Sequence, residues 1–166
     1  MKLPIPDFSC ADVTQITSDL LGSNGIRLLM LDLDNTIAPY GISTPAEDVL
    51  CWANEVRKNG VDLFFVSNSK RPDRVERFAE ILDVGYVKAA HKPSARALKK
   101  VMEEFGKSPD ECGLVGDQIY TDVWAARRAG CRSFLVHPIR FTNPFLFLRY
   151  IAEFPFRAMR RKKLTR

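Results

Sequence analysis

Residues 28–36 read Leu-Leu-Met-Leu-Asp-Leu-Asp-Asn-Thr, a short apolar run followed by two carboxylates. The continuous run 28–31 is typical of a strand buried on both faces of a parallel sheet, although a turn of a buried helix gives the same pattern. On a strand, residues two apart point the same way, so Asp32 and Asp34 would leave its end together. Open parallel sheets bind ligands at that end, and two adjacent carboxylates imply a cation, a shared proton or solvation. The alternative is a polar loop after a core strand.

Apolar runs and helical patterns alternate along the rest of the chain. Strands are predicted at 27–32, 62–66, 86–88, 113–116 and 132–136, and helices at 13–21, 45–59, 71–82, 94–105 and 121–129. Thr44 is the predicted N-cap of the second helix, with Pro45 at its first position. The Pro-containing residues 1–11 are predicted to be irregular. This alternation predicts an α/β, Rossmann-like three-layer sandwich, with a mainly parallel five-stranded sheet and helices on both faces.

The composition excludes several classes of protein. At 166 residues the chain is expected to form one main domain, and 46% hydrophobic with 27% charged residues is ordinary for a globular protein. No apolar run approaches the roughly 20 residues of a membrane span, and the N-terminus lacks the apolar stretch of a signal peptide. The four cysteines are widely spaced, which favours reduced thiols over a zinc site or disulfides. We therefore expect a cytoplasmic protein.

The positive charge is concentrated at the C-terminal end. Residues 140–166 hold eight Lys or Arg and one Glu, a net charge of +7, whereas residues 1–139 carry −2. Six aromatic residues lie between 141 and 156, directly before the most basic stretch. We therefore divide the chain into a domain over 1–138 and an aromatic, basic tail over 139–166, part of which is expected to pack on the domain.

Polar side chains follow four of the predicted strands. They are Asp32 and Asp34, Ser67 and Asn68, Lys92, and Asp117 with Asp122. Parallel strands end at one edge of a sheet, so these groups are expected to converge. Carboxylate oxygens suit Mg²⁺, while a Lys and a Ser hydroxyl suit a phosphate. One carboxylate can then act as a nucleophile and another as a general acid and base.

The order of these residues resembles the haloacid dehalogenase superfamily of phosphohydrolases. Its first motif, Asp-x-Asp-x-Thr, matches Asp32, Asp34 and Thr36. Ser67 and Lys92 match the second and third motifs. The acidic fourth motif matches residues 116–122, which read Gly-Asp-Gln-Ile-Tyr-Thr-Asp.

The resemblance implies a role for each matched residue. Asp32 attacks phosphorus, and Asp34 protonates the leaving alcohol and then activates water. Ser67 and Lys92 hold the phosphoryl oxygens and join the two aspartates as catalytic residues, while Thr36 and Asn68 complete the phosphate site. The implied Mg²⁺ ligands are Asp32, the main-chain carbonyl of Asp34, Asp117, and Asp122 as a ligand or a direct neighbour of the metal.

The distances between motifs predict an enzyme without a cap domain. Asp32 and Ser67 are 35 positions apart, and Ser67 and Lys92 are 25 apart, which leaves room for one helix and one strand in each interval. The site is therefore expected to be open, which suits a large or surface-bound substrate. Lys70, Arg71 and Arg74 could touch an anionic substrate, but a solvated helix face is the preferred interpretation. Neither His91 nor His137 has a partner pattern.

The motifs read Asp-Leu-Asp-Asn-Thr, Ser-Asn-Ser, Lys-Pro and Gly-Asp-Gln-x-x-Thr-Asp. These residues resemble one capless branch of the superfamily, the YqeG-type group of subfamily IIIA, which is similar to the mitochondrial phosphatidylglycerophosphate phosphatase. This resemblance implies hydrolysis of phosphatidylglycerophosphate to phosphatidylglycerol by a peripheral protein on the cytoplasmic membrane face, held to anionic lipid by its basic tail. One alternative is a soluble phosphatase of a nucleotide, sugar or phosphoprotein. Another is a non-catalytic, RNA- or ribosome-associated protein, although intact motifs argue against it and no nucleic-acid partner is expected. The sequence leaves the oligomeric state open.

Overall fold

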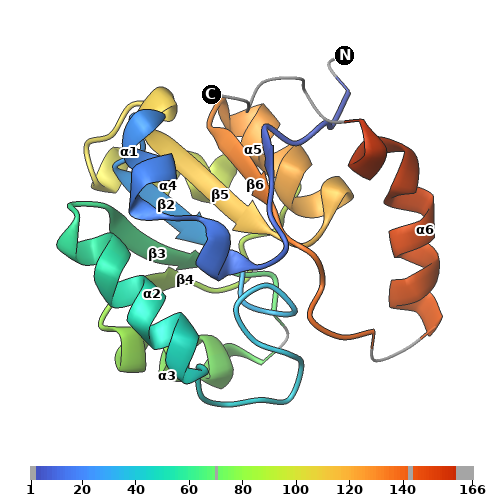
Figure 1. Cartoon of the computed structure of the whole chain (residues 1–166), viewed down its shortest axis with the longest axis horizontal. Helices are drawn as coiled ribbons and strands as arrows, with labels where there is room; N and C mark the ends of the chain where they lie inside the picture. The colour runs from blue at the N-terminus through green and yellow to red at the C-terminus, as the bar shows by residue number, and fades with distance from the viewer. Residues whose placement is uncertain (1–2, 70, 142–143, 160–166) are drawn as a thin grey trace.

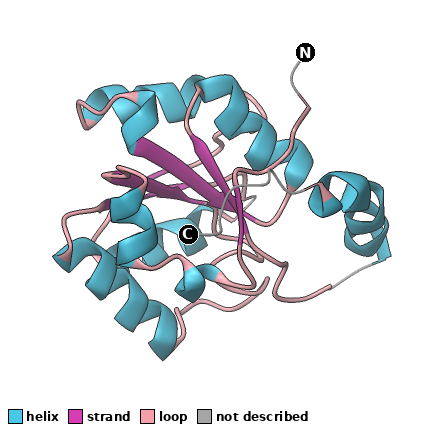
Figure 2. Cartoon of the chain, turned by 45° about the horizontal axis from the view of Figure 1, so that its top comes forward, coloured by secondary structure: helices cyan, strands magenta, loops and turns pink. Residues whose placement is uncertain are grey.

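The structure is a computed structural model that describes residues 3–69, 71–141 and 144–159. In these ranges six strands form one sheet, and every neighbouring pair is parallel. The strands are β1 (Phe8–Ser9), β2 (Leu28–Leu31), β3 (Asp62–Val66), β4 (Gly85–Val87), β5 (Cys112–Gly116) and β6 (Arg132–Leu135), in the order β1-β6-β5-β2-β3-β4. Helices surround the sheet (Figures 1 and 2). The predicted fold class is confirmed, but the sheet has six strands where five were predicted, because β1 was not expected.

Strand β2 lies in the middle of the sheet, where Leu28 pairs with Asp62 of β3 and with Cys112 of β5. All four residues of β2 are buried, which is why the run 28–31 has no polar position. From β2 the chain continues to β3 and β4 on one side and then crosses to β5 on the other. Open parallel sheets bind their ligands where the strand order reverses in this way, and here that point lies between β2 and β5.

Two helical layers enclose two hydrophobic cores. Helices α1 (Ser18–Ser23), α2 (Glu47–Lys58) and α3 (Pro72–Leu82) cover one face, and α4 (Arg96–Glu104) and α5 (Trp124–Ala129) cover the other. Short turns η1 (Val13–Gln15), η2 (Pro109–Glu111) and η3 (Ile119–Val123) complete the domain, and η3 is a π-helical turn. Alternate residues of β2 point into the two cores. Leu29 lies in the core that contains Phe78, and Met30 lies in the core that contains Leu98.

Several predicted boundaries were wrong, and the helix predicted at 13–21 is the turn η1 followed by α1. Residues 1–11 are not wholly irregular, because Phe8–Ser9 form β1 beside β6, where Phe8 stacks on Phe134 with ring centroids 4.6 Å apart. Helix α2 begins at Glu47 with Ala46 as its N-cap, not at Pro45 with Thr44, and two acidic residues in its first turn favour that start. The helix predicted at 121–129 is the turn η3 followed by α5.

The chain carries no inserted cap within the described ranges. Between β2 and β3 the only helix is α2, and between β3 and β4 the only helix is α3. This agrees with the capless architecture that the motif spacing predicts, and it leaves the carboxyl edge of the sheet open.

Helix α6 (Pro144–Ala158) lies along the domain beside η3, at the right of Figure 1. Its Phe156 packs against a small cluster of Ile119, Val123 and Leu135, and the Tyr120 hydroxyl donates to the Ala152 carbonyl at 3.2 Å. Pro155 does not end the helix, which continues to Ala158. Among the described helices, none is both long enough and apolar enough to cross a membrane.

Candidate active site

Five buried polar side chains meet where the central strands end. Asp32, Ser67 and Asp117 directly follow β2, β3 and β5, Lys92 lies just beyond β4, and Asp122 comes from η3. The structure thus brings together side chains that the sequence could only place at one edge of a sheet. Their catalytic roles stay predictions.

Lys92 bridges two of the carboxylates. Its Nζ atom lies 2.6 Å from Oδ1 of Asp32 and 2.7 Å from Oδ1 of Asp122. Carboxylate oxygens of Asp32, Asp117 and Asp122 all lie within 4.8 Å of one another. Three carboxylates share one ammonium group, so the site has an excess of acidic groups and little water to screen them.

This crowding shifts the pKa values. Burial raises the pKa of Asp32 to about 6, because the attraction of Lys92 only partly offsets the loss of water and the repulsion from Asp122. Burial also raises the pKa of Asp117 well above its usual range, and Asp122 and Asp32 add to that shift. Burial alone would lower the pKa of Lys92, but Asp122 and Asp32 outweigh it and raise the pKa, so the ammonium group stays charged.

The donor set fits a small, hard divalent cation. Carboxylate oxygens are the ligands that Mg²⁺ prefers, and a divalent cation would offset the excess acidic groups. The Thr36 hydroxyl lies 3.4 Å from Oδ2 of Asp32 and 3.4 Å from Oδ1 of Asp117, so it helps to orient both carboxylates. Asp32 and Asp117 are placed to hold the metal, with Asp122 beside them.

The π-helical turn η3 positions Asp122. The Oδ2 atom of Asp122 accepts hydrogen bonds from the main-chain N–H of Gln118 at 3.1 Å and from the Thr121 hydroxyl at 3.3 Å. The neighbouring strand end must be glycine, because a Cβ atom at Gly116 would lie 2.2 Å from Cγ of Asp122. The glycine of the Gly-Asp-x-x-x-x-Asp pattern is therefore a packing requirement, and its two aspartates could hold a metal ion.

Asn68 and Ser67 shape the phosphate side of the site. The Asn68 amide donates to the Lys92 carbonyl at 2.9 Å and accepts from the Lys92 N–H at 2.9 Å. These two bonds hold the main chain of Lys92 in place and use one of the two amide protons of Asn68, so its predicted contact with phosphate stays a prediction. The Ser67 Oγ atom accepts from the Ser69 N–H at 3.0 Å, which leaves its own proton available to an anion.

Arg74 of α3 is held against Asp34. It forms a buried ion pair with Oδ1 of Asp34 and donates to the carbonyls of Ile42 at 2.5 Å and Pro39 at 2.8 Å. One guanidinium group thus joins the second carboxylate of the Asp-x-Asp motif to the loop that follows it. The expectation that Arg74 lies on a solvated helix face was wrong.

A model of one protein family matches a large part of the chain. The model, described as a haloacid dehalogenase-like hydrolase, covers residues 19–130, which include every polar residue of the site. The chain belongs to the haloacid dehalogenase-like hydrolase family.

Similar proteins extend this match over the whole chain. The "Probable phosphatase YqeG" of Bacillus subtilis (strain 168) is 27% identical over 163 residues, which cover 97% of this chain and 94% of that protein. An uncharacterized protein from Listeria monocytogenes serotype 4b has a TM-score of 0.57 at 14% identity, covering 72% of this chain and 85% of that one. The cobalt-bound deoxy-D-mannose-octulosonate 8-phosphate phosphatase YrbI from Haemophilus influenzae has a TM-score of 0.56 at 15% identity, covering 68% and 69%. At such low identity the two structures show the fold alone.

In this hydrolase, one sequence signal could have revealed the role of Arg74. The apolar stripe of α3 includes Val75, Phe78 and Leu82, and position 74 lies on the same side of the helix, four residues before Phe78. The guanidinium group indeed lies 5.2 Å from the Phe78 ring centroid. A charged residue inside an apolar stripe needs a buried partner, and here that partner is Asp34. Arg71 is exposed, as expected, and Lys70 lies outside the described residues.

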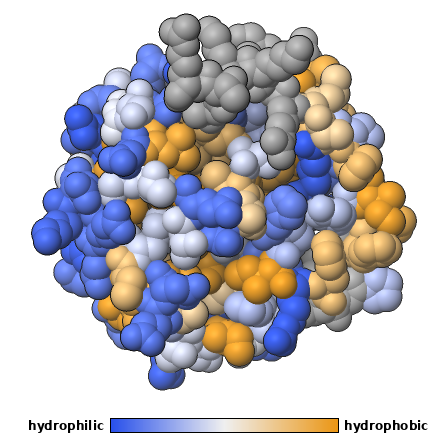
Figure 3. All heavy atoms as spheres, in the orientation of Figure 1, coloured by the Kyte–Doolittle hydropathy of each residue, from blue (hydrophilic) through white to orange (hydrophobic). Residues whose placement is uncertain are grey.

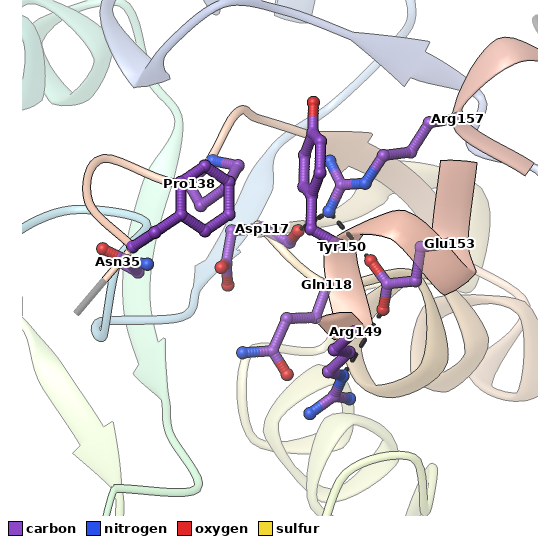
Figure 4. A pocket seen from close by; sticks show the side chains of 9 residues that line it. Asn35, Asp117, Gln118, Pro138, Arg149, Tyr150, Glu153 and Arg157 are labelled. Carbon is purple, nitrogen blue, oxygen red and sulfur yellow. Dashed lines mark hydrogen bonds and ion pairs between the residues drawn. The ribbon is translucent and has the colours of Figure 1, made fainter. Parts of the chain in front are cut away.

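Helix α6 closes one side of the site, next to Asp117 (Figure 4). Arg157 donates to the main-chain carbonyl of Asp117 and pairs with the buried Glu153 at 2.8 Å. A small pocket lies between this helix and the site, and its walls include Asp117, Asn35 and Tyr150. Arg157 is one of the basic residues of the tail, and its side chain is held against the domain rather than turned to solvent.

Asp117→Asn is expected to raise the unfolding temperature of the metal-free hydrolase at pH 7 and to remove most of the stabilisation by Mg²⁺. The amide relieves repulsion among three buried carboxylates, a gain of about 1 kcal/mol or roughly 2–4 °C. Thermal unfolding in EDTA and in Mg²⁺ measures both effects. Asp62→Asn, at the exposed start of β3, is the control. A variant less stable than wild type in EDTA, with an unchanged response to Mg²⁺, would contradict the proposed metal site.

Proposed function

We propose that this hydrolase is a Mg²⁺-dependent phosphatase that cleaves phosphomonoesters through a phosphoryl group carried on Asp32. The observation that carries the proposal is the position of Asp32. It is a buried carboxylate at the tip of the central strand, with one oxygen on Lys92 and two further carboxylates within 4.8 Å. The similarity to the "Probable phosphatase YqeG" supports the same class of reaction.

The reaction has two steps. In the first, an oxygen of Asp32 bonds to phosphorus while the bond from phosphorus to the ester oxygen breaks, and Asp34 gives its proton to that oxygen. In the second, Asp34 takes a proton from a water molecule whose oxygen bonds to phosphorus, and the bond to Asp32 breaks to release inorganic phosphate. The charged Lys92 and the Ser67 hydroxyl donate hydrogen bonds to the phosphoryl oxygens. Asp32, Asp117 and the Asp34 carbonyl would hold Mg²⁺, with Asp122 beside them, and the bound cation would offset phosphoryl charge.

The ion pair between Asp34 and Arg74 fixes the position of the carboxyl group. In the proposed mechanism that group must reach the leaving oxygen in the first step and a water molecule in the second. Arg74 also holds the carbonyls of Pro39 and Ile42, so the acid-base carboxyl and the loop beside it are positioned together. Arg74 is therefore a positioning residue of the proposed mechanism.

We propose phosphatidylglycerophosphate as the substrate. The cleft beside Asp34 encloses about 970 Å³, part of it open solvent, and is lined by Asp34, Tyr40, Gly41, Asn68, Ser69, Arg71 and Arg74. An open cleft without a cap accepts the headgroup of a lipid that stays in its bilayer. The protein would then act on the cytoplasmic membrane face, with its C-terminal basic residues on anionic lipid.

The test is phosphate release from phosphatidylglycerophosphate in mixed micelles, with Mg²⁺ or EDTA, for wild type and Asp32→Asn. Fast release that needs both Mg²⁺ and Asp32 would support the reaction and the substrate. If an aryl phosphate is hydrolysed in the same way but the lipid is not, the reaction stands and the lipid substrate is wrong.

Arg71→Ala is expected to raise the KM for phosphatidylglycerophosphate by about 10- to 100-fold and to leave the KM for an aryl phosphate nearly unchanged. The lipid carries a phosphodiester a few bonds from the scissile monoester, and Arg71 is an exposed cation in the cleft beside Asp34. Loss of one charge-assisted hydrogen bond costs about 1.5–3 kcal/mol, which sets the range.

Arg77→Ala is the matched control, because Arg77 is an exposed arginine two turns further along α3 that lines only a neighbouring groove. If Arg71→Ala and Arg77→Ala raise the KM for the lipid by the same factor, the effect is general charge attraction. If Arg71→Ala raises the KM for the lipid and for the aryl phosphate by the same factor, a contact with the headgroup is contradicted.

A further inference from the structure

Helix α6 turns its charged residues toward the domain and most of its apolar residues toward solvent, which is the reverse of an ordinary surface helix. Its three charged residues, Arg149, Glu153 and Arg157, form ion pairs with one another at the domain, and the Glu153 side chain is only 1% exposed. The side chains turned to solvent are Phe145, Phe147, Leu148, Ile151 and Phe154, and each is at least half exposed. A surface helix normally faces its apolar stripe to the core, so this outer face requires a partner.

The contacts of α6 with the domain fix this orientation. On the inner side the Tyr120 hydroxyl donates to the Ala152 carbonyl, the Tyr120 N–H donates to the Glu153 carboxylate, and Arg157 donates to the Asp117 carbonyl. Rolling the helix over would break these three contacts with the domain. The apolar face is therefore held outward, and Figure 3 shows hydrophobic side chains along the margin of the molecule where α6 lies.

We infer that the outer face of α6 is a surface that inserts into an anionic lipid bilayer. The inference deepens the proposed function, since it names the partner that brings the site to a lipid substrate. Aromatic and aliphatic side chains on one side of a helix that lies in the membrane plane enter the boundary between headgroups and acyl chains. Phe147, Leu148, Ile151 and Phe154 share that side of the helix, whereas Phe145 lies in its first turn.

Charge selects a bilayer over a second copy of the chain. Residues 159–166, which directly follow α6, hold five Lys or Arg and no acidic residue, within a segment 140–166 of net charge +7. Two copies that packed through α6 would place two segments of net charge +7 at one interface, where like charges repel each other. An anionic leaflet instead attracts them, at about 1 kcal/mol for each basic residue near the surface.

Attachment through α6 would also carry the catalytic edge to the membrane. Arg157 joins the helix to the main chain of Asp117, which is one of the carboxylates of the site. A protein bound through the outer face therefore has its active site next to the inner side of the same helix.

The test is co-sedimentation of the full chain with vesicles of phosphatidylcholine alone and of phosphatidylcholine with phosphatidylglycerol, both without phosphatidylglycerophosphate. Ile151→Glu and, as a second variant, Leu148→Glu are expected to reduce binding to the anionic vesicles by about 10-fold or more. Each variant replaces an apolar side chain that would enter the bilayer with a negative charge. Ile81→Glu is the matched control, because Ile81 is 42% exposed and Ile151 is 51% exposed. It should bind as wild type, because Ile81 lies on α3 and not on α6. Aryl phosphate hydrolysis by each variant verifies that it is folded.

Wild-type binding that is stronger on anionic vesicles and is lost in both α6 variants would support the surface. Unchanged binding by those variants, or no binding by wild type, would overturn it. A dimer of wild type in sedimentation velocity that Ile151→Glu dissociates would also overturn it, because a second copy would then cover the face. The vesicles contain no substrate, so the surface can be correct even if the lipid is not hydrolysed.

Discussion

Asp32→Asn is expected to lower phosphate release by about 10⁴-fold or more, which is the scale of loss when a covalent nucleophile is removed. The amide cannot attack phosphorus, although it keeps the shape of the carboxyl group. The fold should survive, because the substitution removes one of three crowded carboxylates and leaves Lys92 paired with Asp122. Steady-state hydrolysis of an aryl phosphate, with circular dichroism as the check on folding, measures the effect.

Asp62→Asn is the control for this experiment, since Asp62 lies at the exposed, opposite end of the neighbouring strand. It should keep full activity. A folded Asp32→Asn protein with activity near that of wild type would show that Asp32 is not the nucleophile.

Arg74→Ala is expected to lower kcat by about 10²-fold, a typical contribution of a correctly placed general acid and base. It should also reduce the free energy of unfolding by about 3–5 kcal/mol, because it leaves Asp34 without its buried partner and frees the carbonyls of Pro39 and Ile42. Hydrolysis kinetics and chemical denaturation measure the two effects separately.

Arg74→Lys separates positioning from stability alone. A lysine can keep the ion pair with Asp34, but it cannot reach both loop carbonyls with a planar fork, so it should recover part of kcat with little change in KM. Arg77→Ala, on the exposed side of the same helix, should match wild type. If both Arg74 variants lose stability while kcat stays at the wild-type value, Arg74 is only a structural residue.

The central part of the fold could be predicted because it depends on local patterns. A four-residue apolar run is a strong signal for β2, and the alternation of strands with helices implies parallel pairing, which sends the polar residues after each strand to one edge. For that reason Asp32, Ser67, Lys92 and Asp117 were placed together without knowledge of the strand order. Strand β1 could not be predicted, because it consists of two residues held by contacts with β6, far away in the sequence.

The missed features share one physical cause, which is a charged residue whose partner is distant in the sequence. Arg74 meets Asp34 across 40 positions, and Arg157 meets the Asp117 carbonyl across the same separation. Composition and spacing favour exposure for such residues, since isolated arginines are rarely buried. The outward apolar face of α6 was missed for the same reason, because the segment carries apolar residues all around and the contacts of Glu153 with Tyr120 and of Arg157 with Asp117 decide which side faces the domain.

The most direct test of the proposed chemistry is to find the phosphoryl group on the protein. Asp34→Asn removes the general base of the second step, while an aryl phosphate has a leaving group that needs little protonation in the first step. Acid-quenched mass spectrometry after mixing this variant with an aryl phosphate and Mg²⁺ should show one phosphoryl group on the peptide that contains Asp32. The double variant with Asp32→Asn should show none. No phosphoryl group on that peptide, or one on a different residue, would contradict the assignment of Asp32 as the nucleophile.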